Sequence, residues 1–311
     1  MYAYYLSKQN LDLSVAEVLA LSKNEKYTLI DNLLVLDELV DYKRLAYTKS
    51  VYELLFLCEK KELKNKLQNY DFEKIYRENF RLNVIGSSEF ETGKLADIIW
   101  KKIKKPVVDL KNAKTKIDII FSKQIFVCLL IEELKDKFEK RRAHLRPYNH
   151  PTSLHPRLAR CLVNLANSKR ILDPFCGSGG ILIEAGLISL DICGFDIDKI
   201  MLKRCKENLE YFKIKNYKLE EKDALKIDRK FECIVTDLPY GKNSKVKDLK
   251  ETYFKFLFKA SKCVERMVVV FPDCVDSEKI IKESGWNVKN SFNYYIHKSM
   301  TKKIFILGKH C

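Results

Sequence analysis

A glycine-rich segment that follows a carboxylate stands near the middle of the chain. Residues 171–185 read I-L-D-P-F-C-G-S-G-G-I-L-I-E-A. A short apolar run ends at Asp173, the turn holds Gly177, Gly179 and Gly180, and a helix is expected directly afterwards. This order is typical of a parallel α/β sheet that binds a ligand at the carboxyl end of its first strand. Glycines in such a turn let the backbone approach the ligand closely.

Asp173 separates the ligand classes that use glycine-rich turns. A nicotinamide dinucleotide site would have a third glycine where Leu182 stands, and a P-loop would have a lysine that is missing here. A carboxylate before the turn would repel a pyrophosphate, but it suits a cationic group such as the amino group of a methionine moiety. The segment therefore favours S-adenosylmethionine over other nucleotides. A glycine turn of an ordinary α/β domain stays the alternative.

Further acidic residues follow the next two predicted strands. Residues 191–198 read D-I-C-G-F-D-I-D, and Asp196 lies about 20 residues beyond the glycine turn, where an acid after strand two meets ribose hydroxyls. A third strand near residues 217–221 leads to Asp223, which could accept a hydrogen bond from an adenine amino group. Adding the loop before the first helix of this region, the predicted cofactor contacts are Thr152, Ser153, Asp173, Phe175, Cys176, Gly177, Gly179, Gly180, Asp196, Asp223, Ala224 and Asp237.

The fourth predicted strand ends in residues suited to methylating an amine on a base. Residues 231–241 read F-E-C-I-V-T-D-L-P-Y-G, which resembles the [D/N]-P-P-[Y/F] signature of methyltransferases that modify exocyclic amino groups. Asp237 would hold the amine and favour the charge that develops on its nitrogen, and the Leu238 carbonyl would take the second N–H. Pro239 fixes the turn, and Tyr240 would stack on a base taken out of its helix. The alternative is a strand exit that merely contains proline.

The overall composition is that of a folded protein. The chain has 311 residues, 46% hydrophobic and 32% charged, which suggests two domains or one large one. Its ten cysteines form no C-x-x-C pair and no Cys/His cluster at metal spacing, so we expect reduced thiols and no metal. The sequence holds no secretory signal at Met1–Leu6 and no run of about 18 apolar residues. We therefore expect a cytoplasmic protein without membrane contact.

The net charge of +16 is distributed unevenly along the chain. Residues 1–100 carry 14 basic and 16 acidic groups, whereas residues 101–311 carry 44 basic and 26 acidic groups. A basic excess confined to one part of a chain indicates a polyanion partner. Charge alone separates neither RNA from DNA nor a binding surface from a lysine-rich surface that keeps the protein soluble.

A charged segment links the two halves of the chain. Residues 132–149 read E-E-L-K-D-K-F-E-K-R-R-A-H-L-R-P-Y-N, which predicts a charged helix that gives way to Pro147. Arg141, Arg142 and Arg146 could line a face that binds RNA phosphates. A solvated linker is the alternative.

The elements that position these residues follow from periodicity and turn signals. The first half predicts strands at 1–6, 27–36, 79–85 and 117–131 and helices at 11–21 and 91–102, with 48–59 left as helix or strand. It contains no catalytic constellation. The second half predicts a helix within 150–166, a helix at 252–264, a buried strand at 267–271 and a closing hairpin of 288–296 with 302–307. The lysine-rich residues 242–250 would form a substrate loop.

Several of these segments together resemble the archaeal and eukaryal THUMP-containing tRNA guanosine-N2 methyltransferases that act on guanosine at position 10. The segments are R-P-Y-N-H-P-T-S-L-H-P-R-L-A-R, D-P-F-C-G-S-G-G, D-L-P-Y-G and H-K-S-M-T-K-K. Three departures are visible: Ser178 where threonine is common, Leu238 where the first proline is common, and Lys111-Asn112-Ala113 in place of an asparagine-proline pair. Because of Leu238, the motif distinguishes less clearly between family members that act on different tRNA positions.

The resemblance implies an α/β, Rossmann-like methyltransferase domain at 150–311, with a mostly parallel sheet and a terminal antiparallel hairpin. It also implies α+β domains before it: a ferredoxin-like domain at 1–50 and a THUMP RNA-binding domain at 51–133, then a linker at 134–149. The expected activity is transfer of a methyl group from S-adenosylmethionine to the N2 of a tRNA guanosine at position 10, with tRNA and in some cases a small activator subunit as partners. Three alternatives stay open: another tRNA guanosine such as position 6, DNA adenine-N6 methylation, and a non-catalytic RNA-binding subunit.

Overall fold

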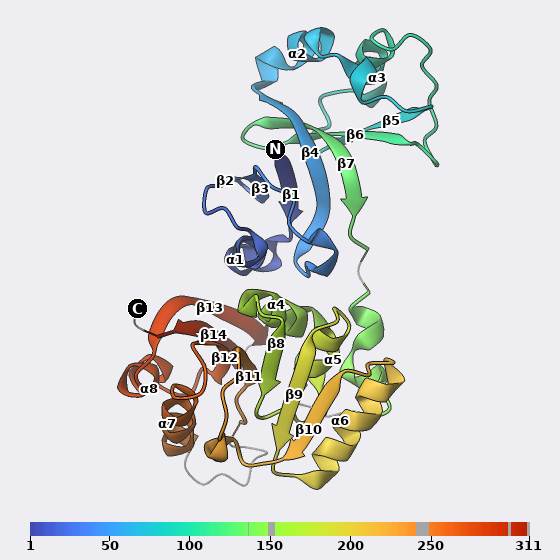
Figure 1. Ribbon diagram of the computed structural model, residues 1–311. Helices are drawn as coiled ribbons and strands as arrows, with labels where there is room; N and C mark the ends of the chain where they lie inside the picture. Colours follow the sequence, from blue (N-terminus) through green and yellow to red (C-terminus); the bar gives the residue numbers. More distant parts are fainter. Residues whose placement is uncertain (136, 149–152, 241–248, 298–299, 310–311) are drawn as a thin grey trace. The chain divides into compact units, whose positions relative to one another are not determined.

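The computed structural model describes residues 1–311 except residue 136 and the segments 149–152, 241–248, 298–299 and 310–311 (Figure 1). The chain forms two compact units. The first comprises Met1–Val15, Ser22–Lys43 and Thr48–Lys135, and the second comprises Ala16–Leu21, Arg44–Tyr47 and Asp136–Cys311. In the described part of the chain, no helix is long and apolar enough to cross a bilayer.

A mostly antiparallel sheet organises the first unit. Over the described residues it has seven strands in the order β2-β3-β1-β4-β7-β6-β5, and β5 and β6 pair in parallel. The predicted turn after residue 30 is formed by Asp31, with φ of 51°, and by Asn32, whose amide donates to the Leu6 carbonyl at 2.6 Å. The elements up to residue 135, of which α1 is divided between the two units, are in chain order β1 (Tyr2–Leu6), α1 (Leu11–Leu21), β2 (Thr28–Ile30), β3 (Leu33–Leu36), β4 (Thr48–Cys58), α2 (Leu63–Asn69), β5 (Phe80–Ile85), α3 (Thr92–Trp100), β6 (Thr115–Phe121) and β7 (Ile125–Glu133).

The stretch at 48–59, for which periodicity did not distinguish helix from strand, forms strand β4 up to Cys58. It lies inside the sheet, where it pairs with β1 through Thr48–Glu53 and with β7 through Ser50–Cys58. The predicted boundary between residues 50 and 51 therefore falls within one strand, and both halves of the first unit share a continuous sheet. Their assignment as a ferredoxin-like domain and a THUMP domain stays a prediction.

A mostly parallel sheet organises the second unit, as predicted. Among the described residues the strand order is β10-β9-β8-β11-β12-β14-β13, with β14 antiparallel to both of its neighbours. The order switches between β8 and β11, and open α/β sheets bind ligands at the carboxyl ends of strands beside such a switch. The elements are α4 (Pro156–Ala166), β8 (Arg170–Asp173), α5 (Gly180–Gly186), β9 (Asp191–Asp196), α6 (Lys199–Tyr211), β10 (Tyr217–Glu221), β11 (Cys233–Asp237), α7 (Leu249–Ala260), β12 (Arg266–Pro272), α8 (Ser277–Glu283), β13 (Asn287–His297) and β14 (Met300–Gly308).

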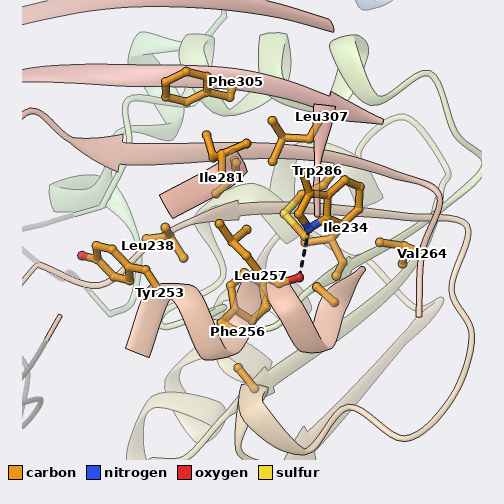
Figure 2. Packing of buried hydrophobic residues seen from close by; sticks show 14 of the residues in the cluster. Ile234, Leu238, Tyr253, Phe256, Leu257, Val264, Ile281, Trp286, Phe305 and Leu307 are labelled. Carbon is orange, nitrogen blue, oxygen red and sulfur yellow. Dashed lines mark hydrogen bonds between the residues drawn. The ribbon is translucent and has the colours of Figure 1, made fainter. Parts of the chain in front are cut away.

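One hydrophobic core of the second unit lies between the sheet and the helices α7 and α8. Figure 2 shows Ile234, Leu238 and Leu257 packed together, all fully buried. The Trp286 indole N–H, also in Figure 2, donates to the Leu257 carbonyl at 2.9 Å. Burying one leucine or isoleucine side chain contributes about 1.5–3 kcal/mol. This packing fixes Leu238, the residue directly after Asp237, and with it the exit of β11.

The linker contradicts the prediction of a charged helix over residues 132–149. Strand β7 continues to Glu133, and among the described residues that follow only short 3-10 turns form, at Glu139–Arg141 and Ala143–Leu145. The physical reason is a tertiary contact, because the Arg141 Nε atom donates to the buried Glu184 carboxylate at 2.7 Å. Arg160 of α4 pairs with the same carboxylate at 3.0 Å. Holding these ion pairs overrides the helical tendency of the charged sequence.

Candidate active site

The glycine-rich turn begins where β8 ends. Gly177 and Gly179 have φ of 51° and 88°, in the left-handed region that favours glycine. A Cβ atom on Gly179 would lie 2.8 Å from the Cys205 Sγ atom, so a larger residue would also meet a steric clash. The Cys176 N–H donates to the Phe195 carbonyl at 3.0 Å and ties the turn to β9. Backbone groups are thus exposed to a ligand at the carboxyl edge of the sheet.

Asp173 is a buried carboxylate that pairs with no cation among the described residues. It is 2% exposed and accepts hydrogen bonds from the Thr236 hydroxyl at 2.7 Å and the Phe175 N–H at 3.2 Å. Burial raises the pKa of Asp173 to about 7; the carboxylates of Asp237 and Asp196 add to the rise, and the two hydrogen bonds oppose it. A ligand ammonium group would supply the missing positive charge. The site therefore fits the methionine end of S-adenosylmethionine.

Asp196, at the end of β9, faces the same turn. Its Oδ2 atom accepts the Gly177 N–H and its Oδ1 atom accepts the Asp198 N–H, each at 2.9 Å. Burial raises its pKa, and these backbone bonds oppose the shift. A carboxylate oxygen has two acceptor lone pairs. Asp196 therefore keeps capacity for the two hydroxyls of a ribose, the role predicted for it.

The other predicted cofactor contacts lie around these carboxylates. The Ser153 hydroxyl lies 3.2 Å from the Ser178 hydroxyl of the turn. Asp223 caps a short 3-10 turn by accepting the Leu225 N–H at 2.8 Å. The Phe175 ring packs edge-on against the Phe256 ring. Cys176 and Ala224 are buried. Thr152 lies outside the described residues, as does most of the predicted substrate loop at 242–250. The cofactor role of each residue stays a prediction.

Asp237 ends β11 and binds two side chains, those of Tyr240 and Lys302. Its Oδ1 atom accepts the Tyr240 hydroxyl at 2.6 Å, and its Oδ2 atom accepts the Lys302 ammonium group at 2.7 Å. The same ammonium group lies 4.5 Å from the centre of the Tyr240 ring. Burial raises the pKa of Asp237, and the charge and hydrogen bond of Lys302 oppose the rise. The carboxylate is thus held in one orientation, with lone pairs left to accept an amine.

The turn after Asp237 is anchored on both sides. The Leu238 N–H donates to the Val270 carbonyl of β12 at 3.0 Å. A proline at this position has no N–H and would lose that bond. The Pro239 carbonyl accepts the hydroxyl of Tyr253 on α7. The leucine that departs from the D-P-P-Y pattern thus has a structural reason, because it adds a backbone hydrogen bond and fills the core.

The three linker arginines lie in different environments. The Arg141 side chain is 15% exposed and bound to Glu184, and Arg146 is 6% exposed as a residue. The Arg142 side chain is 50% exposed, and its ion pair with Glu139 lies at the surface. In this arrangement Arg142 is the member of the set that an RNA phosphate could reach directly. RNA binding by the set stays a prediction.

Known proteins that resemble this chain are methyltransferases. A family model described as RMKL-like, methyltransferase domain, matches residues 143–302. The tRNA (guanine(10)-N2)-dimethyltransferase of Methanothermobacter thermautotrophicus is 33% identical over 283 residues, covering 86% of this chain and 84% of the relative. The chain belongs to this methyltransferase family. Another member, from Pyrococcus abyssi, is 36% identical over 209 residues, which is 64% of each chain.

The fold of this family member also matches a solved structure. TrmN from Thermus thermophilus aligns over 99% of both chains with a TM-score of 0.52 and 19% identity. At that identity the likeness establishes the fold, a Rossmann-like methyltransferase with mixed sheets. In the described part of the chain, no group of three or more His, Cys, Asp or Glu side chains is placed to hold a metal ion.

Two residues of the methyltransferase site were not predicted from the sequence. Thr236 orients Asp173, and Lys302 pairs with Asp237. A signal for Lys302 existed, because it shares the period-two face of β14 with Ile304 and Ile306, both buried. A lysine in such a register is expected to have a buried partner. Thr236 gave no comparable signal, since threonine is common in strands.

Proposed function

We propose that this chain transfers methyl groups from S-adenosylmethionine to the exocyclic N2 of a guanosine in tRNA, at position 10. The observation that carries the proposal is the juxtaposition of Asp173, Asp196 and Asp237 at the carboxyl edge of one parallel sheet. The substrate is inferred from the two relatives, which are named tRNA (guanine(10)-N2)-dimethyltransferases. A tRNA substrate would place the enzyme in the cytoplasm.

The residues of the chain have distinct tasks in this reaction. S-adenosylmethionine, when bound, supplies a methyl group whose bonding electron pair stays on sulfur as the nitrogen lone pair forms the new bond. Asp173 would hold the ammonium group of its methionine part, and Asp196 would hold its ribose. Asp237 would accept one N–H of the guanine amine, and the Leu238 carbonyl would accept the other. The nitrogen is released from conjugation as it gains positive charge, which Asp237 favours, and positioning supplies much of the rate.

Recognition of tRNA would combine the two units of the chain. The first unit, with its predicted ferredoxin-like and THUMP domains, would bind the tRNA at a distance from the reacting base. Arg142 would contribute to phosphate binding, and Tyr240 would stack on the base after it leaves its helix. A small activator subunit is a further partner to test.

The decisive experiment is transfer of labelled methyl groups to unmodified tRNA transcripts, followed by digestion to nucleosides. We expect label in N2-methylguanosine and N2,N2-dimethylguanosine. Label in N6-methyladenine from duplex DNA, with none in tRNA, would contradict the proposal. If tRNA is not methylated, calorimetric titration with S-adenosylmethionine separates two cases: binding directs the search to an activator subunit, and no binding favours a non-catalytic RNA-binding subunit.

A further inference from the structure

Lys302 reaches the catalytic turn from a distant part of the chain. Asp237 pairs in register with Val270 of β12, and Lys302 of β14 pairs with Pro272, two residues further along β12. Its side chain therefore reaches across β12 to Asp237 at the end of β11. The Nζ atom lies 2.7 Å from the Asp237 Oδ2 atom.

The ion pair is almost excluded from water. The Lys302 side chain is 4% exposed and the Asp237 side chain is 14% exposed. A buried lysine is rare, and replacing a buried ion pair by apolar residues is often neutral or stabilising. Stability alone is therefore a weak reason for this pair. Its place is informative, because the lysine touches both Asp237 and the Tyr240 ring and is not part of the apolar core around Leu257.

The charge of Lys302 favours the ionised form of Asp237. Burial raises the pKa of this carboxyl group, and its interaction with Lys302 lowers it. Among the described residues, the other titratable groups near Asp237 are acidic or phenolic: Asp173 of β8, Tyr240 of its own turn and Tyr253 of α7, with Asp273 after β12 near Tyr240. Without Lys302, the pKa of the carboxyl group would rise further, and a protonated carboxyl group could no longer accept an amine N–H from both oxygens.

We propose that Lys302 is a positioning residue that keeps the Asp237 carboxylate ionised and oriented toward the substrate amine. The effect of Lys302 on catalysis rests on the proposed function. Its effect on the ionisation of Asp237 does not. In its ionised form the carboxylate accepts a hydrogen bond from the amine. The proton that the nitrogen loses passes to water.

The test compares Lys302→Met, which keeps the length of the side chain without its charge, with Lys302→Arg, which keeps the charge. Lys303→Met is the matched control, because the neighbouring side chain points to the opposite face of β14 and is partly exposed. At saturating tRNA and pH 7, Lys302→Met should lower kcat about a hundredfold, the usual effect of losing one transition-state electrostatic group. Its kcat should rise with pH as Asp237 ionises. Lys302→Arg should recover most of the activity, and Lys303→Met should retain it.

A second readout does not depend on methyl transfer. Aspartate labelled with carbon-13 at the carboxyl group reports ionisation by NMR, and Asp237→Asn identifies the Asp237 signal. We expect that signal to titrate at a higher pH in Lys302→Met than in the unaltered protein. An unchanged titration overturns the inference, whatever the activities. If the titration shifts but the unaltered protein neither binds S-adenosylmethionine nor methylates tRNA, the ion pair stands and the proposed function fails. Equal losses of kcat in Lys302→Met and Lys302→Arg with flat pH profiles would overturn the positioning role.

Discussion

Binding of S-adenosylmethionine should release a proton from Asp173. Burial raises the pKa of this carboxyl group to about 7. At pH 6, about nine-tenths of the free protein therefore carries the proton, and at pH 7 about half does. The ligand ammonium group keeps its own proton at pH 6, since α-amino groups titrate near 7.7–8.0. If the ammonium group pairs with an ionised Asp173, binding should release about 0.9 proton at pH 6.

The same shift has a consequence for stability in the absence of ligand. The pKa of Asp173 is raised by folding from its ordinary 3.8, so the native state binds this proton more tightly than the unfolded state does. The resulting stabilisation is complete below about pH 4 and is lost as pH rises through about 7. At about 1.36 kcal/mol per pKa unit, the loss above pH 7 is about 4 kcal/mol. Bound S-adenosylmethionine should offset this loss of stability, because its ammonium group would pair with the ionised Asp173.

The assay is isothermal titration calorimetry at pH 6 in buffers that differ in their enthalpy of ionisation. The slope of the binding enthalpy against the buffer enthalpy gives the number of protons released. Thr236→Val removes the 2.7 Å hydrogen bond that favours the charged carboxylate, so it should raise the release at pH 7 from about one half toward one. Asp196→Asn should lower the release at pH 6 only slightly, because the Asp196 carboxylate is the smallest of the causes that raise the pKa of Asp173. A binding enthalpy that is independent of buffer at pH 6 would refute the reasoning.

Three further predictions follow from the site. Asp237→Asn should lower methyl transfer at least about a hundredfold and leave S-adenosylmethionine binding in calorimetry nearly unchanged, whereas normal turnover would remove Asp237 from catalysis. Gly179→Ala, at φ of 88°, should cost about 1–3 kcal/mol in denaturant unfolding, and an unaltered midpoint would contradict the strained turn. Arg142→Ala should reduce the salt slope of tRNA binding by about one. Arg141→Ala should instead lower the melting temperature, because its partner Glu184 is fully buried. Identical behaviour of the two variants would contradict their different environments.

Much of the second unit could be predicted from the sequence. Strong local signals placed β8, β9 and β11, because each combines an apolar run with an acid or a turn at its carboxyl end. Parallel strands carry their ends to one edge of a sheet, so Asp173, Asp196 and Asp237 could be expected to lie together. The terminal hairpin of β13 and β14 was also predicted, at residues 288–296 and 302–307.

The contacts that the sequence did not reveal are long-range and electrostatic. The charged linker reads as a helix locally, yet Glu184 lies 43 residues away and holds Arg141 in a different conformation. The partner of Asp237 lies 65 residues away on β14. Which charges meet across such distances depends on strand order, and strand order is not encoded in local periodicity. The pairing of β4 with both β1 and β7 escaped for the same reason.

The central claim is tested most directly by mapping the methylated guanosine in tRNA. Three transcripts would be compared: one natural, one with adenosine at position 10 and one with adenosine at position 6, the positions named for relatives of this chain. We predict labelled N2-methylguanosine in the natural transcript and in the position 6 variant, and none in the position 10 variant. Label that survives the change at position 10 but disappears with the change at position 6 would contradict the proposed site of methylation.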